Sequence, residues 1–166
     1  MSPNSTQNIA TFTLGNDLFG VDIRYVREIN RQLDLTPVPH APAFVEGLLN
    51  LRGQIVTVLD LKKRLGVGKT QLGDHTHNVI LKTEGEFSEI RTRSDGDTLD
   101  ERPLMNDLTS LLVDDIADVV TIDANAVEPA PANLELIDRR YIAGIVKLDK
   151  RLLTVLNVHA LQHGLN

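Results

Sequence analysis

One segment of the chain resembles the end of a phosphate-binding loop. Gly66-Val67-Gly68-Lys69-Thr70 has the glycines and the lysine that such loops use to hold phosphate oxygens. The complete motif also needs a glycine five residues before Gly68, where this chain has Lys63, and it lies between a strand and an apolar helix. We therefore interpret the segment as the end of a short helix followed by a linker.

Two groups of polar side chains have the residue types of metal ligands. The acidic residues between Asp95 and Glu101 lack the glycine and the twelfth-position glutamate of a calcium-binding loop. His75 and His77 alternate in a polar linker, but a zinc site would need further ligands, and the chain has no cysteine. We predict no metal site and no cofactor.

The chain also lacks a recognisable catalytic group. Without cysteine it has no thiol nucleophile, and no serine lies in the Gly-x-Ser-x-Gly pattern. Its carboxylates show no pairing that would distinguish acid–base catalysis from a solvated surface. An enzyme would need several titratable groups that converge in one pocket, and the sequence indicates none. We predict a protein that is not an enzyme.

Two segments combine charged and apolar residues in a way that suits binding to another protein. They are Val26-Arg27-Glu28-Ile29 and Asn50-Leu51-Arg52-Gly53, the second at a hairpin turn. Glu28 and Arg52 could form a surface ion pair worth about 0–1 kcal/mol, or a charged anchor beside an apolar groove. Tight turns or close approaches of the backbone are allowed at three further positions, Gly47, Gly53 and Gly144.

The composition restricts the class of partner. The chain has 166 residues, 42% of them hydrophobic and 24% charged, which is the balance of an ordinary globular domain. A net charge of −6 and an aromatic content of 4% argue against nucleic acid, whose binding needs basic and aromatic surfaces. No signal-peptide pattern and no apolar run of about 20 residues is present. We expect a cytoplasmic protein.

Short apolar runs between glycine and proline breaks predict strands. These runs are rich in valine, isoleucine and leucine, and they lie at 9–14, 19–23, 55–59, 79–81, 111–113, 119–122, 141–146 and 152–158. Only two segments suggest helices, Asp60 to Leu65 before Gly66 and Val158 to His163 before Gly164. We therefore predict an all-β fold with a few short helices.

An internal repeat relates the two halves of the chain. Residues 44–61 align without a gap on residues 141–158, so that Gly47 matches Gly144. Two prolines precede each segment, at 39 and 42 and at 129 and 131. Two hairpins can resemble each other by chance, but the gapless match and the shared prolines favour two related β lobes.

The segment from Glu84 to Asp107 interrupts the second half. It contains eight acidic residues and three arginines, which is typical of a mobile loop or an insertion. We predict one domain over residues 9–161, with lobe one at about 17–75 and lobe two at about 76–157. The N- and C-terminal strands could be exchanged between the lobes. We further predict an acidic loop insertion at 84–107 and a disordered tail at 1–8.

A series of short motifs runs along nearly the whole chain, from Ile9 to Leu161. The motifs are Phe12-Thr13-Leu14-Gly15, Phe19-Gly20-Val21-Asp22-Ile23, Val26-Arg27-Glu28-Ile29, Phe44-Val45-Glu46-Gly47-Leu48-Leu49-Asn50-Leu51-Arg52-Gly53, Leu112-Val113-Asp114, Pro129-Ala130-Pro131 and Tyr141-Ile142-Ala143-Gly144-Ile145. In this order they resemble the CheW family of bacterial chemotaxis adaptors.

The resemblance implies two SH3-like β-barrels of five strands each, in a protein that is not a catalyst. Its partners would be the C-terminal regulatory domain of a CheA-type histidine kinase and the cytoplasmic tips of methyl-accepting chemoreceptors. It would bind no nucleic acid and would not insert into a membrane. The receptor- or kinase-binding surface would comprise Val26, Glu28, Ile29, Gly47, Asn50, Leu51, Arg52, Gly53, Ile116, Val119 and Gly144.

Two departures from the family pattern bear on the pathway. The strand before Val113 begins Thr109-Ser110-Leu111 rather than with glycine, and the 84–107 segment is longer than the expected turn. The alternatives are a divergent paralogue in another receptor–kinase pathway, such as surface motility, and an interaction module without kinase coupling. The intact motif at 50–53 favours the adaptor, which would act in the cytoplasm at membrane-associated receptor arrays.

Overall fold

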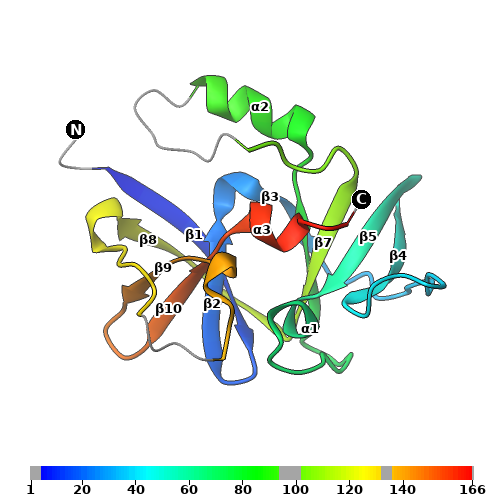
Figure 1. Cartoon of the computed structure of the whole chain (residues 1–166), viewed down its shortest axis with the longest axis horizontal. Helices are drawn as coiled ribbons and strands as arrows, with labels where there is room; N and C mark the ends of the chain where they lie inside the picture. Colours follow the sequence, from blue (N-terminus) through cyan, green and yellow to red (C-terminus); the bar gives the residue numbers. More distant parts are fainter. Residues whose placement is uncertain (1–4, 94–101, 132–135, 166) are drawn as a thin grey trace.

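The computed structural model describes residues 5–93, 102–131 and 136–165, and the strands in these ranges form two five-stranded sheets (Figure 1). The first sheet has the order β8-β1-β2-β10-β9 and consists of β1 (Thr6–Leu14), β2 (Asp17–Asp22), β8 (Asp115–Asp123), β9 (Ile142–Lys147) and β10 (Leu152–Leu156). The second has the order β3-β6-β7-β5-β4 and consists of β3 (Val26–Asn30), β4 (Val45–Leu51), β5 (Gln54–Asp60), β6 (His77–Leu81) and β7 (Leu108–Val113). The prediction of an all-β fold is confirmed.

Each sheet combines strands from both halves of the repeat. In the repeat, β1 corresponds to β6, β2 to β7, and so on to β5 and β10. If every strand of the first sheet is replaced by its counterpart in the other half, the strand order becomes that of the second sheet. The halves are joined by two antiparallel pairs, β1 with β8 and β3 with β6, and by two parallel pairs, β2 with β10 through Leu18 and Leu153 and β5 with β7 through Val56 and Leu108. The repeat seen in the sequence is therefore present in the topology, with strands swapped between the halves.

The division between the sheets differs from the predicted lobe boundary near residue 75. β6 and β7 join the same sheet as β3, β4 and β5, so this sheet takes residues 26–113, whereas the first sheet takes 6–22 and 115–156. The predicted tail is also too long. β1 begins at Thr6, because residues 6–8 pair with residues 121–123 of β8.

Among the described residues, three apolar clusters fill the sheets and the space between them. One surrounds Leu153 in the first sheet, and another surrounds Leu112 in the second. The third joins the two sheets and contains Phe12, Leu59 and Leu111. β7 is buried along its whole length, because alternate side chains of a strand point to opposite faces and both faces here meet a cluster.

Short helices follow β5 and β10 at equivalent places in the repeat, as predicted. α1 (Leu61–Leu65) begins after Asp60, whose carboxylate caps the first turn, and ends at Gly66 with a φ of +77°. α3 (Val158–Gln162) begins after Asn157, whose side chain caps it in the same way.

Arg64 of α1 connects these two helices. Its Nε donates to the Leu161 carbonyl oxygen at 3.0 Å, near the end of α3, where helix carbonyls lack partners within the helix. Its guanidinium lies 4.1 Å from the ring centre of Phe44 and 5.2 Å from that of Tyr141. Phe44 and Tyr141 are equivalent in the repeat, so one side chain ties both halves together.

A third helix, α2 (Glu84–Arg93), occupies part of the segment predicted to be an acidic loop. Thr83 and Glu86 form a capping box, in which the Thr83 N–H donates to Glu86 Oε1 at 3.1 Å and the Glu86 N–H donates to Thr83 Oγ1 at 3.4 Å. Phe87 is fully buried and stacks on Tyr25, with ring centres 4.4 Å apart. The loop prediction is wrong for these residues. The segment is mostly polar, but the capping box starts a helix and the buried Phe87 ring packs this helix on the core.

The described residues also include three 3₁₀ helices, and each begins after an aspartate that caps it. They are η1 (Ile23–Tyr25), η2 (Ala124–Ala126) and η3 (Arg139–Tyr141). None of the helices in the described ranges is long and apolar enough to cross a membrane.

Candidate partner-binding site

β3 and the turn between β4 and β5 bring together the two charged residues of the predicted binding surface. Arg52 Nη2 donates to Glu28 Oε1 in a hydrogen-bonded ion pair. β3 and β4 are the opposite edges of the second sheet, so this pair connects one edge strand, β3, with the turn that follows the other edge strand. The Arg52 side chain is 66% exposed, which leaves it accessible to a partner.

The turn determines where Arg52 lies. Arg52 and Gly53 are its central residues, with φ values of +52° and +87°, and positive φ at both positions is the mark of a type I′ turn. Gly53 adopts this conformation without strain, whereas arginine does so rarely. The Gly53 N–H donates to Asn50 Oδ1 at 2.9 Å, which closes the turn. Arg52 therefore stands on a fixed backbone.

The charge of Glu28 is stabilised by its neighbours. The hydrogen bond from Arg52 lowers the pKa of the Glu28 carboxyl, against the opposing effect of burial. Asn30 Nδ2 also donates to Glu28 Oε2, at 3.3 Å, and acts in the same direction as Arg52. Glu28 is therefore ionised at neutral pH. A partly solvated pair of this kind contributes about 0–1 kcal/mol to stability, so it suits orientation of a partner better than support of the fold.

The apolar members of the predicted surface lie on β3 and β8, which occupy equivalent edges of the two sheets. Val26 and Ile116 are partly buried and pack against the apolar cluster that joins the two sheets, which we call the central cluster. Ile29 and Val119, on the same strands, are 39% and 54% exposed. Both halves of the molecule thus offer apolar surface, and the assignment of these residues to one groove stays a prediction.

Gly47, Leu51 and Gly144 are buried, so we correct their assignment to a contact surface. A Cβ atom at Gly47 would lie 2.7 Å from the Thr36 carbonyl oxygen, and one at Gly144 would lie 2.2 Å from Val127 Cγ1. Leu51 is 1% exposed and belongs to the core of the second sheet. Residue type alone did not show which of these positions face solvent.

The two buried glycines lie at equivalent crossings, by which we mean places where a segment outside the sheet pairs with β4 or β9 through a single pair of residues. Thr36 and Leu48 exchange two backbone hydrogen bonds of 2.8 and 2.9 Å, and Glu128 and Ile145 exchange two of 2.7 and 2.8 Å. Each crossing lies beside a glycine whose missing side chain lets the two backbones approach. The predicted close approach of the backbone at these two glycines is confirmed.

Sequence reasoning missed the contribution of α2 to this region. Arg27 of β3 forms an ion pair with Glu86 of α2, with 3.6 Å between Nε and Oε2. A cavity of about 560 Å³ lies between these residues, the start of β5 and residues 106–108. Ile55 lines it and is 56% exposed. The available signal was the capping-box spacing of residues 83 and 86.

The segments first considered for phosphate or metal have other roles in the described structure. Thr70 is buried, and its N–H and Oγ1 donate to the Asp60 carboxylate at 2.9 and 2.7 Å. His77 Nδ1 lies 2.6 Å from the carbonyl oxygen of His75. Within the described ranges, no three histidine, cysteine, aspartate or glutamate side chains gather as a metal site. The acidic residues between Asp95 and Glu101 lie outside those ranges.

Comparison with known proteins gives one consistent result. The model of the CheW-like domain family matches residues 8–165. The chemotaxis protein CheW of Treponema pallidum is 31% identical over 164 residues, which cover 97% of this chain and 85% of that protein. Protein FrzA of Myxococcus xanthus is 36% identical over 70 residues, 42% of this chain and 44% of that one. The crystal structure of the scaffolding protein TtCheW from Thermoanaerobacter tengcongensis is similar, with a TM-score of 0.75, 30% identity, and coverage of 95% and 88%.

Proposed function

The chain belongs to the CheW-like domain family, and on this premise we propose that it is a non-catalytic adaptor that couples chemoreceptors to a CheA-type histidine kinase. The observation that carries the proposal is the family match over residues 8–165, which spans both halves of the repeat. The similar proteins of T. pallidum and T. tengcongensis are described as a chemotaxis protein and a scaffolding protein.

The receptor tip would bind through the accessible members of the candidate site. A chemoreceptor tip is a helical hairpin, and a helix commonly binds by placing its apolar face in a groove. Ile29 and Val119 would supply exposed apolar contacts, and Arg52 would reach a carboxylate or carbonyl of the receptor. The ion pair with Glu28 orients the guanidinium before the partner arrives, which reduces the entropy lost on binding.

The kinase would bind through its C-terminal regulatory domain, and the mechanism is one of assembly. An adaptor that holds receptor and kinase together raises the effective concentration of each for the other. The conformation of the receptor can then shift the population of active kinase, provided that the two states bind with different affinity. The complex would form in the cytoplasm, at receptor arrays on the membrane.

A reconstitution tests this function directly. The full chain is combined with a CheA-type kinase and receptor signalling fragments from the same organism, and kinase autophosphorylation is measured with and without each component. We expect activation that requires all three proteins. Binding to neither partner, measured in parallel by sedimentation with receptor fragments, would contradict the proposal.

A second candidate is a divergent paralogue that serves another receptor–kinase pathway such as surface motility; one of the similar proteins, FrzA, does not carry the CheW name. That match covers less than half of either chain, whereas the match to the T. pallidum protein covers 97% of this one. The same reconstitution with each kinase of the organism distinguishes the two, because only the cognate kinase should be activated.

A further inference from the structure

Arg27 lies at the one place where β3 departs from regular pairing with β6. Val26 lies opposite Leu81, and Glu28 lies opposite the residue before it, Ile80. The register therefore shifts between Val26 and Glu28, and Arg27 is the extra residue of a β-bulge. A bulge changes the direction of a side chain and is common beside functional sites. Here it lies next to Glu28, the acidic member of the candidate site.

Two carboxylates attract the Arg27 guanidinium. Its Nε lies 3.6 Å from Glu86 Oε2, in the ion pair between β3 and α2. The pKa of the Glu28 carboxyl is lowered mainly by the hydrogen bond from Arg52 and, to a smaller extent, by the charge of Arg27. Arg27 and Arg52 are therefore two cations that compete for Glu28, and Glu86 is the carboxylate that holds Arg27.

The start of α2 fixes the position of Glu86. Its Oε1 accepts from the Thr83 N–H at 3.1 Å and from Thr83 Oγ1 at 3.2 Å, which leaves Oε2 for Arg27. The next residue, Phe87, is fully buried and stacks on Tyr25. Because Tyr25 precedes Arg27 by two residues, this contact sets the first turn of α2 against the segment that leads into the bulge.

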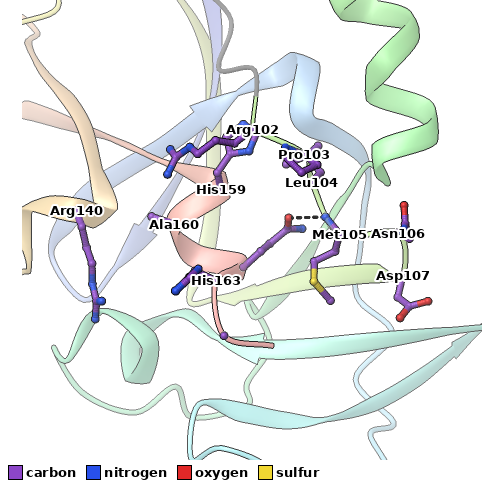
Figure 2. A pocket seen from close by; sticks show the side chains of 12 residues that line it. Arg102, Pro103, Leu104, Met105, Asn106, Asp107, Arg140, His159, Ala160 and His163 are labelled. Atoms are coloured by element: carbon purple, nitrogen blue, oxygen red, sulfur yellow. Dashed lines mark hydrogen bonds between the residues drawn. The ribbon is translucent and has the colours of Figure 1, made fainter. Parts of the chain in front are cut away.

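The segment that follows α2 in the chain also fixes its first turn. The Glu84 N–H donates to the Met105 carbonyl oxygen at 2.9 Å, and the Leu104 N–H donates to Glu84 Oε1 at 2.8 Å. The Met105 N–H donates in turn to Gln162 Oε1 of α3 at 3.1 Å, the bond drawn in Figure 2. The first turn of α2 is thus tied to the rest of the fold, whereas Arg27 lines the cavity of about 560 Å³ and has room to move.

We propose that Glu86 is a positioning residue for the partner-binding surface: it holds Arg27 away from Glu28, so that Glu28 pairs with Arg52. Without the Glu86 charge, Arg27 turns to Glu28, and the Arg52 guanidinium loses its fixed orientation. A partner must then immobilise that side chain, which weakens binding. The effect on binding rests on the proposed adaptor function, but the choice of ion pair is made within this chain.

Glu86→Gln removes the charge and keeps the helix cap. Glutamine serves like glutamate at this position of a capping box, because its side-chain oxygen also accepts from the Thr83 N–H. Glu89→Gln is the matched control, since Glu89 is an exposed glutamate of the same helix. The double variant Glu86→Gln/Arg27→Gln removes the competing arginine as well and should restore the original pair.

The pair is first measured in the free chain. Rotation about the Nε–Cζ bond of Arg52 exchanges its two Nη groups, and the hydrogen bond from Nη2 to Glu28 slows this rotation. NMR exchange spectroscopy should show faster exchange in Glu86→Gln, and the wild-type rate in the double variant and the control. Wild-type exchange in Glu86→Gln, as expected if Arg27 turned to Asp107 on the same cavity, would overturn the proposal.

The effect on the partner is measured by calorimetric titration of the full chain with a receptor signalling fragment. We expect Glu86→Gln to weaken binding by about twofold to fivefold, the range for partly exposed ion pairs, and the double variant to bind like the wild type. A double variant that binds no better than Glu86→Gln would show structural damage rather than competition and overturn the proposal. If the wild type binds no receptor fragment, the adaptor function fails, and the Arg52 exchange rates still decide this inference.

Discussion

Arg52 allows binding to be separated from folding by one substitution. Its side chain is largely exposed, and its ion pair with Glu28 contributes about 0–1 kcal/mol. We expect Arg52→Ala to lower Tm by about 4 °C at most, yet to reduce receptor-dependent kinase activation several-fold. Arg151→Ala is the control, since Arg151 is an exposed arginine of the hairpin in the other half. A large loss of Tm with activation unchanged would contradict the assignment.

Glu84 gives a prediction about pH. Its carboxylate accepts from Arg91 Nη1 at 2.7 and 2.9 Å and from the Leu104 N–H at 2.8 Å, and these bonds lower its pKa, with Arg91 the larger cause. A carboxyl with a lowered pKa in the folded state stabilises the protein above its unfolded pKa, about 4.3, and this stability is lost as the pH falls through the lower folded pKa.

The measurement is urea unfolding between pH 3 and 7. The wild type should lose stability below about pH 4.5 more steeply than Glu84→Gln, which has no carboxyl to protonate at this position. Glu89→Gln, at an exposed position of the same helix, should follow the wild-type curve. Parallel curves for the wild type and Glu84→Gln would show that this carboxylate contributes nothing.

α2 is held mainly by one aromatic side chain. Phe87 is fully buried against Tyr25, and Arg91 lies 4.9 Å from the centre of its ring. We expect Phe87→Ala to lower the free energy of unfolding by about 3–5 kcal/mol, as for other buried phenylalanines. Glu89→Ala should change it by less than about 0.5 kcal/mol. An effect of Phe87→Ala as small as that of the control would mean that the helix does not pack on the core.

A further prediction concerns the two glycines, Gly47 of β4 and Gly144 of β9, that allow a second backbone segment to approach these strands. Gly144→Ala and Gly47→Ala should each destabilise the fold, because the new Cβ meets atoms at 2.2 and 2.7 Å. Gly73→Ala is the control, since a Cβ there meets nothing within 4 Å. Thermal melting checks all three variants, and equal Tm values would contradict the close approach. The expected loss is about 1–3 kcal/mol, as for other overpacked sites.

The strands and the two short helices α1 and α3 were predictable because their signals are local. Asp60 and Gly66 bound α1 in the sequence as they do in the structure. α2 was missed because the polar average of residues 84–107 concealed Phe87. The division between the sheets was missed because the pairing of Leu18 with Leu153 joins residues far apart in the chain, and no local pattern records it.

The candidate site was predictable in the same uneven way. The ion pair of Glu28 and Arg52 was foreseen because both residues stand in recognisable motifs beside predicted strands. The burial of Gly47 and Gly144 was not, because a glycine needed for close approach looks the same in sequence whether it lies on a surface or beneath a crossing segment. The link from Arg27 to Glu86 depends on α2 and was missed with it.

At the scale of the whole molecule, the exchange of strands should make the two halves unfold together. Each sheet needs strands from both halves, and the central cluster joins the sheets. We expect one urea transition, with the same midpoint by far-ultraviolet circular dichroism and by tyrosine emission. Tyr25 and Tyr141 both belong to the central cluster, so their emission reports on it. Two separated transitions would show that the sheets are independent.

The order in which the ribosome makes the chain gives the strand exchange another consequence. The second sheet can form once residue 113 has been made, because all of its strands lie within residues 26–113. The β1–β2 hairpin is made before them, but β10, the parallel partner of β2, is not complete until residue 156. At usual rates of translation that interval is on the order of ten seconds. During it, Ile9, Phe12 and Phe19 are without their final packing, and β2 has an open edge of the kind that promotes aggregation. A nascent chain stalled before residue 152 would therefore be a preferred client for a chaperone that recognises apolar hairpins.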